Sequence, residues 1–221
     1  HKLGTLRITK KSKEWIAQIA VTIPTVLGIG TKIMGVDLGL KVPAVAATDD
    51  EKVHFFGNGR QNKYMKRKFR SERKALGKKK KVNAIRNLNN KEQRWMTNQD
   101  HKVSREIVNF AKDNNISVIR LERLANIRQT ARTSRKNEKN LHTWSFYRLA
   151  QFIEYKAKMA GIQVEYVNPA YTSQICPVCS VRNKAPDRRY KCKCGFEKHR
   201  DIVGAMNIRY APVVDGHSQP A

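Results

Sequence analysis

The sequence predicts an α/β fold that carries a small cysteine-rich insertion near its C-terminal end. The apolar segments follow the order of three strands, a long helical stretch, a strand, a helix, a strand and a last helix. All four cysteines lie in two close pairs between the last strand and the last helix. With 221 residues, the chain is long enough for one full-sized domain and a small appendage.

The first 30 residues are predicted to form a β-hairpin and a linker. Residues 5–8 and 15–21 each place apolar side chains at alternate positions, and a polar turn separates them. We expect the hairpin to cover an edge of a sheet. Residues 24–30 contain a proline and two glycines, which are typical of a linker.

The next segment predicts three strands and a helical hairpin. Residues 33–37, 42–47 and 52–56 are strand-like, and their connections are short enough for an antiparallel meander. Residues 62–114 then repeat apolar side chains at helical spacing, with a break at the lysine run 78–81. The sequence therefore predicts a long and very basic helical hairpin.

The second half of the chain returns to strands. Residues 117–121 form a β-branched strand that ends at Glu122, and residues 124–141 are so polar that we expect a mobile loop. Residues 144–159 have helical periodicity. The aromatic side chains of this helix favour the core over base stacking, because they recur at helical spacing. They are Trp144, Tyr147, Phe152 and Tyr155.

The last part of the chain completes the fold. Residues 162–167 are a final strand, residues 202–209 a last helix, and residues 211–221 a tail that we expect to be disordered. This order of strands and helices is that of an RNase H-like domain. The cysteine-rich segment would then be inserted before its last helix.

The spacing of the cysteines predicts a zinc site. Cys176 and Cys179 are separated by two residues, and Cys192 and Cys194 by one. Four thiolates bind zinc tetrahedrally without a core of their own. The alternative is two disulfides, but a bridge across one intervening residue is strained. His199 is a competing ligand, yet four thiolates already fill the shell, so we expect its side chain to be exposed.

The charge of the chain predicts a polyanionic partner. Its 45 lysines and arginines face 18 acids, a net charge of +27. Residues 60–140 alone hold 25 basic and 7 acidic residues. This imbalance favours nucleic acid over an anionic membrane or simple solubility. No apolar run is long enough to span a membrane, and no secretory signal is expected, so metal-type cysteines fit a reducing cytoplasm.

Three acids stand at positions where a charged carboxylate is unusual in so basic a chain. Asp37 interrupts the apolar run IMGVDLG, Glu122 ends the strand SVIRLE, and Asp201 opens the last helix. A buried carboxylate must be paired or coordinated to stay ionised. In an RNase H-like sheet the first and fourth strands are neighbours, and the last helix faces them, so the three carboxylates would converge.

Such a cluster predicts a magnesium site and nucleic-acid cleavage. Mg²⁺ prefers carboxylate oxygens, phosphate and water, and two such ions can assist phosphodiester hydrolysis. Each acid also has a structural alternative. Asp201 would be a helix N-cap, Glu122 an ion-pair partner of Arg120 or Arg123, and Asp37 a turn former.

Several motifs closely resemble TnpB, the RNA-guided endonuclease family of insertion sequences, which is related to type V CRISPR effectors. They are GVDLG at 35–39, RLERLANIR around Glu122, YTSQ before the first cysteine pair, and CGFEKHRDIVGAMNI at 194–208. The resemblance implies a RuvC nuclease over residues 31–170 and 199–210. It also implies a zinc ribbon at 171–198, a lid at 124–141, and the end of a wedge-type domain at 1–30.

The resemblance further implies roles and partners. Asp37, Glu122 and Asp201 would bind Mg²⁺ or Mn²⁺ and catalyse DNA cleavage at a site addressed by a guide RNA. Since all three acids are retained, we expect an active nuclease. The alternatives are a zinc-ribbon regulator without cleavage and a transposase that joins strands. Nucleic-acid contacts are expected from a set of basic residues: Lys66, Arg67, Arg70, Lys78, Lys79, Lys80, Lys81, Arg128, Arg132 and Arg135.

Overall fold

The structure is a computed structural model that describes residues 2–11, 14–24, 30–124 and 146–214. Nearly all of the predicted loop at 124–141 lies outside the described residues, as do Trp144 and most of the predicted linker and tail. The basic residues Arg128, Arg132 and Arg135 also lie outside them.

A five-stranded mixed sheet forms the centre of the molecule. Its strands run in the order β5-β4-β3-β6-β7. They are β3 (Lys32–Leu38), β4 (Ala44–Ala47), β5 (Val53–Phe56), β6 (Ile116–Glu122) and β7 (Gln163–Val167). β3, β4 and β5 pair antiparallel, which confirms the predicted meander, whereas β6 is parallel to both β3 and β7. The predicted first and fourth strands, β3 and β6, are therefore neighbours.

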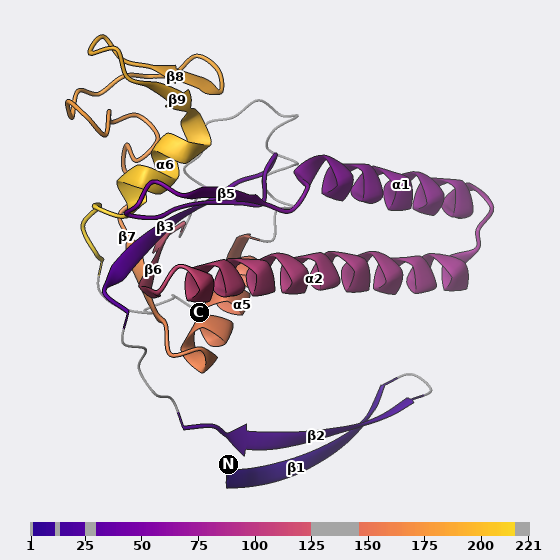
Figure 1. Cartoon of the computed structure of the whole chain (residues 1–221). Helices are drawn as coiled ribbons and strands as arrows, with labels where there is room; N and C mark the ends of the chain where they lie inside the picture. Colours follow the sequence, from indigo (N-terminus) through magenta and orange to yellow (C-terminus); the bar gives the residue numbers. More distant parts are fainter. Residues whose placement is uncertain (1, 12–13, 25–29, 125–145, 215–221) are drawn as a thin grey trace.

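Helices cover both faces of this sheet (Figure 1): α2 (Val82–Asp113) and α5 (Phe146–Met159) lie on one face and α6 (Arg200–Ile208) on the other. α1 (Gly59–Lys78) packs against α2 instead. The main core fills the space between the sheet and the pair α2 and α5, with fully buried side chains such as Met34, Ile107, Ile119 and Ile153. A smaller core lies under α6, where Ala205 packs against Val45 and Ala47. No described helix is both long and apolar enough to cross a membrane.

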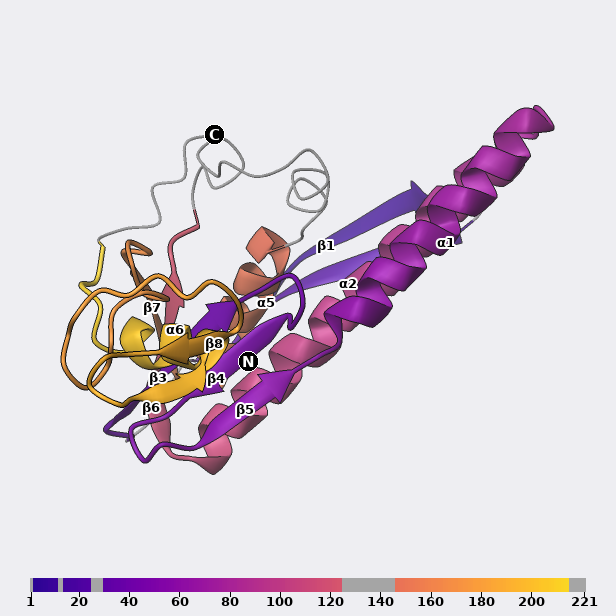
Figure 2. The ribbon, with the colours of Figure 1, turned by 90° about the horizontal axis from the view of Figure 1, so that it is seen from above.

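The hairpin of α1 and α2 extends well beyond the sheet (Figure 2). Its turn lies at residues 79–81, within the lysine run where the sequence predicted a break. Arg67, Arg70 and the lysines 78–81 are exposed, whereas Lys66 is half-buried. Burial lowers the pKa of Lys66, and the nearby acids Glu92 and Asp100 oppose that shift. The hairpin therefore presents a strongly basic surface to solvent.

The described aromatic residues of α5 that we expected in the core, Tyr147, Phe152 and Tyr155, are not in it. Tyr147 and Tyr155 are each 42% exposed, and Phe152 stacks on His101 with ring centroids 4.0 Å apart. The aliphatic face of the same helix is buried instead, with Leu149 and Ile153 in the main core. Helical spacing identifies residues that share a face, but when two faces are apolar it does not say which one packs inward.

The N-terminal hairpin does not cover an edge of the central sheet, so that expectation was wrong. β1 (Lys2–Lys11) and β2 (Glu14–Thr22) pair with each other in a separate two-stranded sheet, which lies away from the helices in Figure 1. Leu3, Ile8 and Trp15 are each more than 60% exposed. Alternation identifies the apolar face of such a hairpin but does not identify its partner.

Candidate active site and metal centre

Asp37 and Glu122 lie at the same end of two neighbouring strands. Asp37 is on β3 between the buried residues Val36 and Leu38. Val36 is opposite Leu121 in the parallel pairing of β3 with β6, so Glu122 follows on β6 as Asp37 follows on β3. Since parallel strands end at the same edge of a sheet, the two carboxylates share that edge.

Asp201 approaches the same edge from the first turn of α6. It is not the N-cap, because His199 precedes the helix and its Nδ1 accepts a hydrogen bond from the Asp201 amide (3.3 Å). His199 is therefore a half-buried cap and not the exposed side chain that we expected. α6 comes close to β3 because Gly204 has no side chain: a Cβ there would lie 3.0 Å from Asp37 Oδ2.

The charges of Glu122 and Asp201 act on Asp37. Burial raises the pKa of Asp37 well above its usual value, and the charges of Glu122 and Asp201 raise it further. The guanidinium groups of Arg200 and Arg188 oppose this shift. Burial also raises the pKa of Glu122. A bound cation would offset the burial that raises the pKa values of Asp37 and Glu122, and the repulsion by the other two acids that adds to the shift of Asp37.

The acids nevertheless do not form one tight ligand set. Within the described ranges, only the four cysteines bring ligand atoms of three or more side chains within 4.8 Å of one another. Asp201 instead makes an ion pair through Oδ2 with Arg188 Nη1. Sites with two ions are wider than a single coordination shell, since their ions lie roughly 3.5–4 Å apart. The spacing of the acids is thus more open than that of the thiols.

Glu122 bonds Thr172, and Arg120, one of the arginines considered for it on sequence grounds, pairs with another acid. Arg120 donates from Nε to Glu165 Oε2 at 2.8 Å. Glu122 Oε1 accepts a hydrogen bond from the hydroxyl of Thr172, and that bond opposes the rise in its pKa. Thr172 is buried and belongs to the YTSQ segment before the cysteines. It fixes the position of one carboxylate oxygen.

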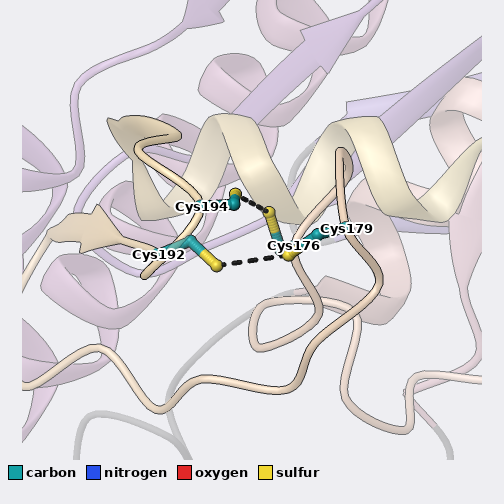
Figure 3. A group of neighbouring side chains, drawn as sticks. All are labelled: Cys176, Cys179, Cys192 and Cys194. Carbon is teal, nitrogen blue, oxygen red and sulfur yellow. Dashed lines mark hydrogen bonds between the residues drawn. The ribbon is translucent and has the colours of Figure 1, made fainter.

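The four cysteines face one another in the inserted segment (Figure 3). The Sγ atoms of Cys176 and Cys194 are 3.6 Å apart, and those of Cys179 and Cys192 are 3.4 Å apart. All four thiols are free, so the disulfide alternative is not what the structure holds. Four sulfurs at about 2.3 Å from a tetrahedral zinc would be about 3.8 Å apart, so the observed spacing fits that ion closely.

Two hairpins hold the thiols in place. The first knuckle is closed by the Cys176 amide, which donates to Val181 O at 3.0 Å. The second lies between β8 (Arg189–Lys191) and β9 (Glu197–His199), which pair antiparallel. The backbone amide of Cys194 is the main cause that lowers the pKa of Cys192 to about 7. Asn183 Nδ2 also donates to Cys192 Sγ at 3.1 Å, which further favours a thiolate.

Sequence reasoning missed three residues that contact these sites: Thr172, Arg188 and Asn183. Thr172 had a signal, because it stands in the YTSQ motif immediately before the cysteines. Arg188 had none, since it is one arginine among many. Asn183 also had none, because the spacing of thiols carries no information about donors around them.

The protein-family comparison matches residues 146–208 to the "Cas12f1-like, TNB domain". Among curated proteins, the TnpB-like protein MJ0751 of Methanocaldococcus jannaschii is 37% identical over 121 residues, which are 53% of this chain and 43% of that protein. The CRISPR-associated endodeoxyribonuclease Cas12f1 of Sulfoacidibacillus thermotolerans is 31% identical over 195 residues, which are 80% of this chain and 45% of that protein. The chain thus spans less than half the length of these curated relatives.

Solved structures share the fold. A cryo-EM structure of a Cas12f1–sgRNA–target DNA complex matches with a TM-score of 0.69 at 23% identity, covering 92% of this chain and 55% of that one. A CRISPR-Cas12f ternary complex matches with a TM-score of 0.72 at 22% identity, covering 95% and 46%. The chain is therefore a relative of the TnpB-like and Cas12f1 proteins, and its predicted resemblance to the TnpB family is confirmed.

Proposed function

We propose that this chain is the catalytic portion of an RNA-guided, divalent-metal-dependent DNA endonuclease with an RNase H-like (RuvC) fold. The observation that carries the proposal is the effect of the charges of Glu122 and Asp201 on Asp37, which brings acids of β3, β6 and α6 together at one end of the sheet. Two relatives with nuclease or TnpB-like names support the reaction class, and the nucleic acids in the matching complex support DNA and guide RNA as partners.

The three carboxylates would hold Mg²⁺ or Mn²⁺, which supplies an activated water and stabilises the leaving oxygen in phosphodiester hydrolysis. Thr172 keeps one oxygen of Glu122 engaged, so the other remains for a ligand. Arg188 and Arg200 add positive charge beside the acids. That charge favours approach of a phosphate to a site whose own side chains are anionic.

The test is cleavage of single-stranded DNA by the 221-residue chain in Mg²⁺ or Mn²⁺. We expect nicking by the unchanged chain and none by Asp37→Ala. Glu106→Ala is the matched control, because Glu106 is an exposed acid on α2 and should leave cleavage unchanged. Equal cleavage by the Asp37 variant would assign the activity elsewhere and favour a regulator that binds without cutting. Joined products in a strand-transfer assay with labelled transposon ends would favour transposition.

For the four cysteines we propose a structural zinc ribbon over residues 171–198. The near-tetrahedral spacing of the Sγ atoms supports it. Metal analysis in reducing buffer should give about one zinc per chain, and chelation should unfold the ribbon, because zinc binding of roughly 10–16 kcal/mol is also folding free energy in such modules. A chain without zinc that keeps its ribbon ordered would contradict this.

A further inference from the structure

Tyr171 and Arg182 form an exposed stack at the base of the first cysteine knuckle. The guanidinium carbon of Arg182 lies 3.5 Å from the centre of the Tyr171 ring. At that distance the guanidinium lies flat on the ring, because a tilted group would push a nitrogen into it. Tyr171 is 47% exposed and Arg182 is exposed, so the stack offers planar surface to solvent.

The stack is held in place from both sides. Tyr171 has a φ of +64°, a left-handed conformation that bulky residues rarely adopt. Its carbonyl accepts hydrogen bonds from the amides of Gln174 (2.8 Å) and Ile175 (3.1 Å). Arg182 Nε donates to Gln174 Oε1 at 3.0 Å, which fixes the plane of the guanidinium. Strained residues that the surrounding structure holds are concentrated at functional sites.

The stack is connected to the acids through the residue next to Tyr171 in the sequence. The residue after Tyr171 is Thr172, whose hydroxyl bonds Glu122. Asn207 of α6 donates from Nδ2 to the carbonyls of Thr172 (2.6 Å) and Ile175 (2.7 Å), which ties this turn to the helix that carries Asp201. Tyr171 is thus on the turn that holds Glu122 and contacts the helix of Asp201, so a nucleotide stacked on its ring would be bound on the same segment that positions the acids.

We propose that Tyr171 and Arg182 are a stacking platform for an unpaired base of the strand to be cut, which positions the adjacent phosphate at the acids. The platform rests on the proposed nuclease function and adds to it a nucleotide-positioning site. Aromatic rings and guanidinium planes both stack on bases, whatever the sequence. The alternative is that Tyr171 and Arg182 only stabilise the turn, in which case their exposed surface would bind no base.

Binding without cleavage tests the platform. Single-stranded DNA carrying 2-aminopurine is titrated into the 221-residue chain without Mg²⁺ or Mn²⁺, and base stacking is followed as fluorescence quenching and binding as anisotropy. We expect Tyr171→Ala to weaken binding about 5- to 150-fold and to lose quenching, as for loss of a stacked base. Tyr171→Phe keeps the ring and should bind like the unchanged chain.

A strand of abasic sugar-phosphate separates stacking from charge. Tyr171→Ala should bind that strand as the unchanged chain does, because no base is present to lose. The matched control is Tyr210→Ala: Tyr210 is also exposed and lies by a guanidinium, 4.9 Å from that of Arg209, but beyond the far end of α6. Arg182→Ala is a second variant in case Tyr171→Ala loses zinc or melts early.

Three results would overturn the platform. Tyr171→Ala and Arg182→Ala could bind base-containing DNA as tightly as the unchanged chain does, or Tyr171→Ala could bind the abasic strand more weakly by the same factor. The third is that the unchanged chain does not bind single-stranded DNA. The nuclease proposal fails separately. If binding depends on Tyr171 but no strand is cut in Mn²⁺, the platform stands and the assignment of the acids falls. If Tyr171→Ala cuts and binds DNA as well as the unchanged chain, the nuclease proposal stands and the platform falls.

Discussion

Asp201 and Arg188 join the last helix to the zinc-ribbon segment through a single ion pair. The guanidinium of Arg188 is half-buried beside the nearly buried carboxylate of Asp201. It therefore lies where a cation bound by Asp201 would lie, and it already neutralises that carboxylate. The residue next to it, Arg189, is more exposed and pairs with Glu197 of β9 instead. Two adjacent arginines therefore have different electrostatic environments.

Arg188→Ala should raise the affinity of the acids for Mn²⁺. Removing one positive charge a few ångströms from a divalent ion is worth about 2 kcal/mol in a solvated environment, which corresponds to about a 30-fold lower Kd. Calorimetric titration of Mn²⁺ into the zinc-loaded chain measures this. Arg189→Ala is the control and should leave the Kd unchanged. Weaker Mn²⁺ binding by Arg188→Ala would mean that the arginine organises the site and does not compete with the ion.

Asp37→Asn should stabilise the chain at neutral pH when zinc is present and Mg²⁺ is absent. Because the folded pKa of Asp37 is raised, the folded chain keeps a proton that the unfolded chain loses above about pH 4. Stability therefore falls as pH rises from there toward the folded pKa, by roughly 1.4 kcal/mol for each unit of the shift. The melting temperature of Asp37→Asn should exceed that of the unchanged chain near pH 8, and the difference should disappear toward pH 4. A constant gain across that range would rule out titration as its cause.

At the scale of elements, α6 depends on two glycines that let it approach β3. A Cβ on Gly35 would clash with the backbone carbonyl of Ala205, and a Cβ on Gly204 would press on Asp37. The close approach brings Asp201 to the strand that carries Asp37. The same glycines therefore support both the packing of the second core and the position of the acids.

Gly35→Ala should destabilise the chain by about 1–3 kcal/mol, as overpacking does, because a backbone carbonyl yields less readily than a side chain. Gly77→Ala is the opposite control. Gly77 is within helix α1 and has nothing closer to its added Cβ than Ile85 Cδ1 at 4.0 Å, so the same change should stabilise by roughly 0.5–1 kcal/mol. Urea unfolding measures the free energy of unfolding of both variants, which should fall for Gly35→Ala and rise for Gly77→Ala. Equal effects would show that the close approach of α6 is not tight.

The elements themselves were largely predictable because their signals are local. The strands β3 to β7 begin and end within about two residues of their predicted bounds, and the break between α1 and α2 lies at the lysine run. The side of α5 that packs inward was not predictable, since aromatic and aliphatic residues share its periodicity. The partner of the N-terminal hairpin was not predictable either, because alternation describes a face and not what covers it.

The site was predictable in part for the same reason. Asp37 and Glu122 were brought together by the pairing of β3 with β6, which follows from the order of strands. The contacts of Thr172 and Arg188 required the path of the inserted segment in space. Their side chains are ordinary in composition, so only the tertiary fold distinguishes them from their neighbours.

At the scale of the molecule, positive charge is concentrated on the part that projects farthest. The hairpin of α1 and α2 extends from the body, and its turn carries four consecutive exposed lysines, 78–81. Asp37 and Glu122 lie on the sheet, and Asp201 lies on α6, which packs on it. The basic surface of the hairpin is thus separate from the three acids, and under the proposed function the binding of DNA and of cations should respond differently to salt.

Replacing the four lysines 78–81 by glutamine should reduce the salt dependence of duplex DNA binding. Each phosphate contact contributes about −0.9 to the slope of log K against log salt, so loss of four contacts lowers its magnitude by about 3 to 4. The control removes the same charge from scattered exposed positions, Lys10, Lys41, Lys112 and Lys158. Anisotropy titrations from 50 to 200 mM salt compare the two. Because both variants have the same net charge, an equal change in slope would mean that the chain attracts DNA by its overall charge, whereas a larger change for the hairpin variant would locate the phosphate contacts at its turn.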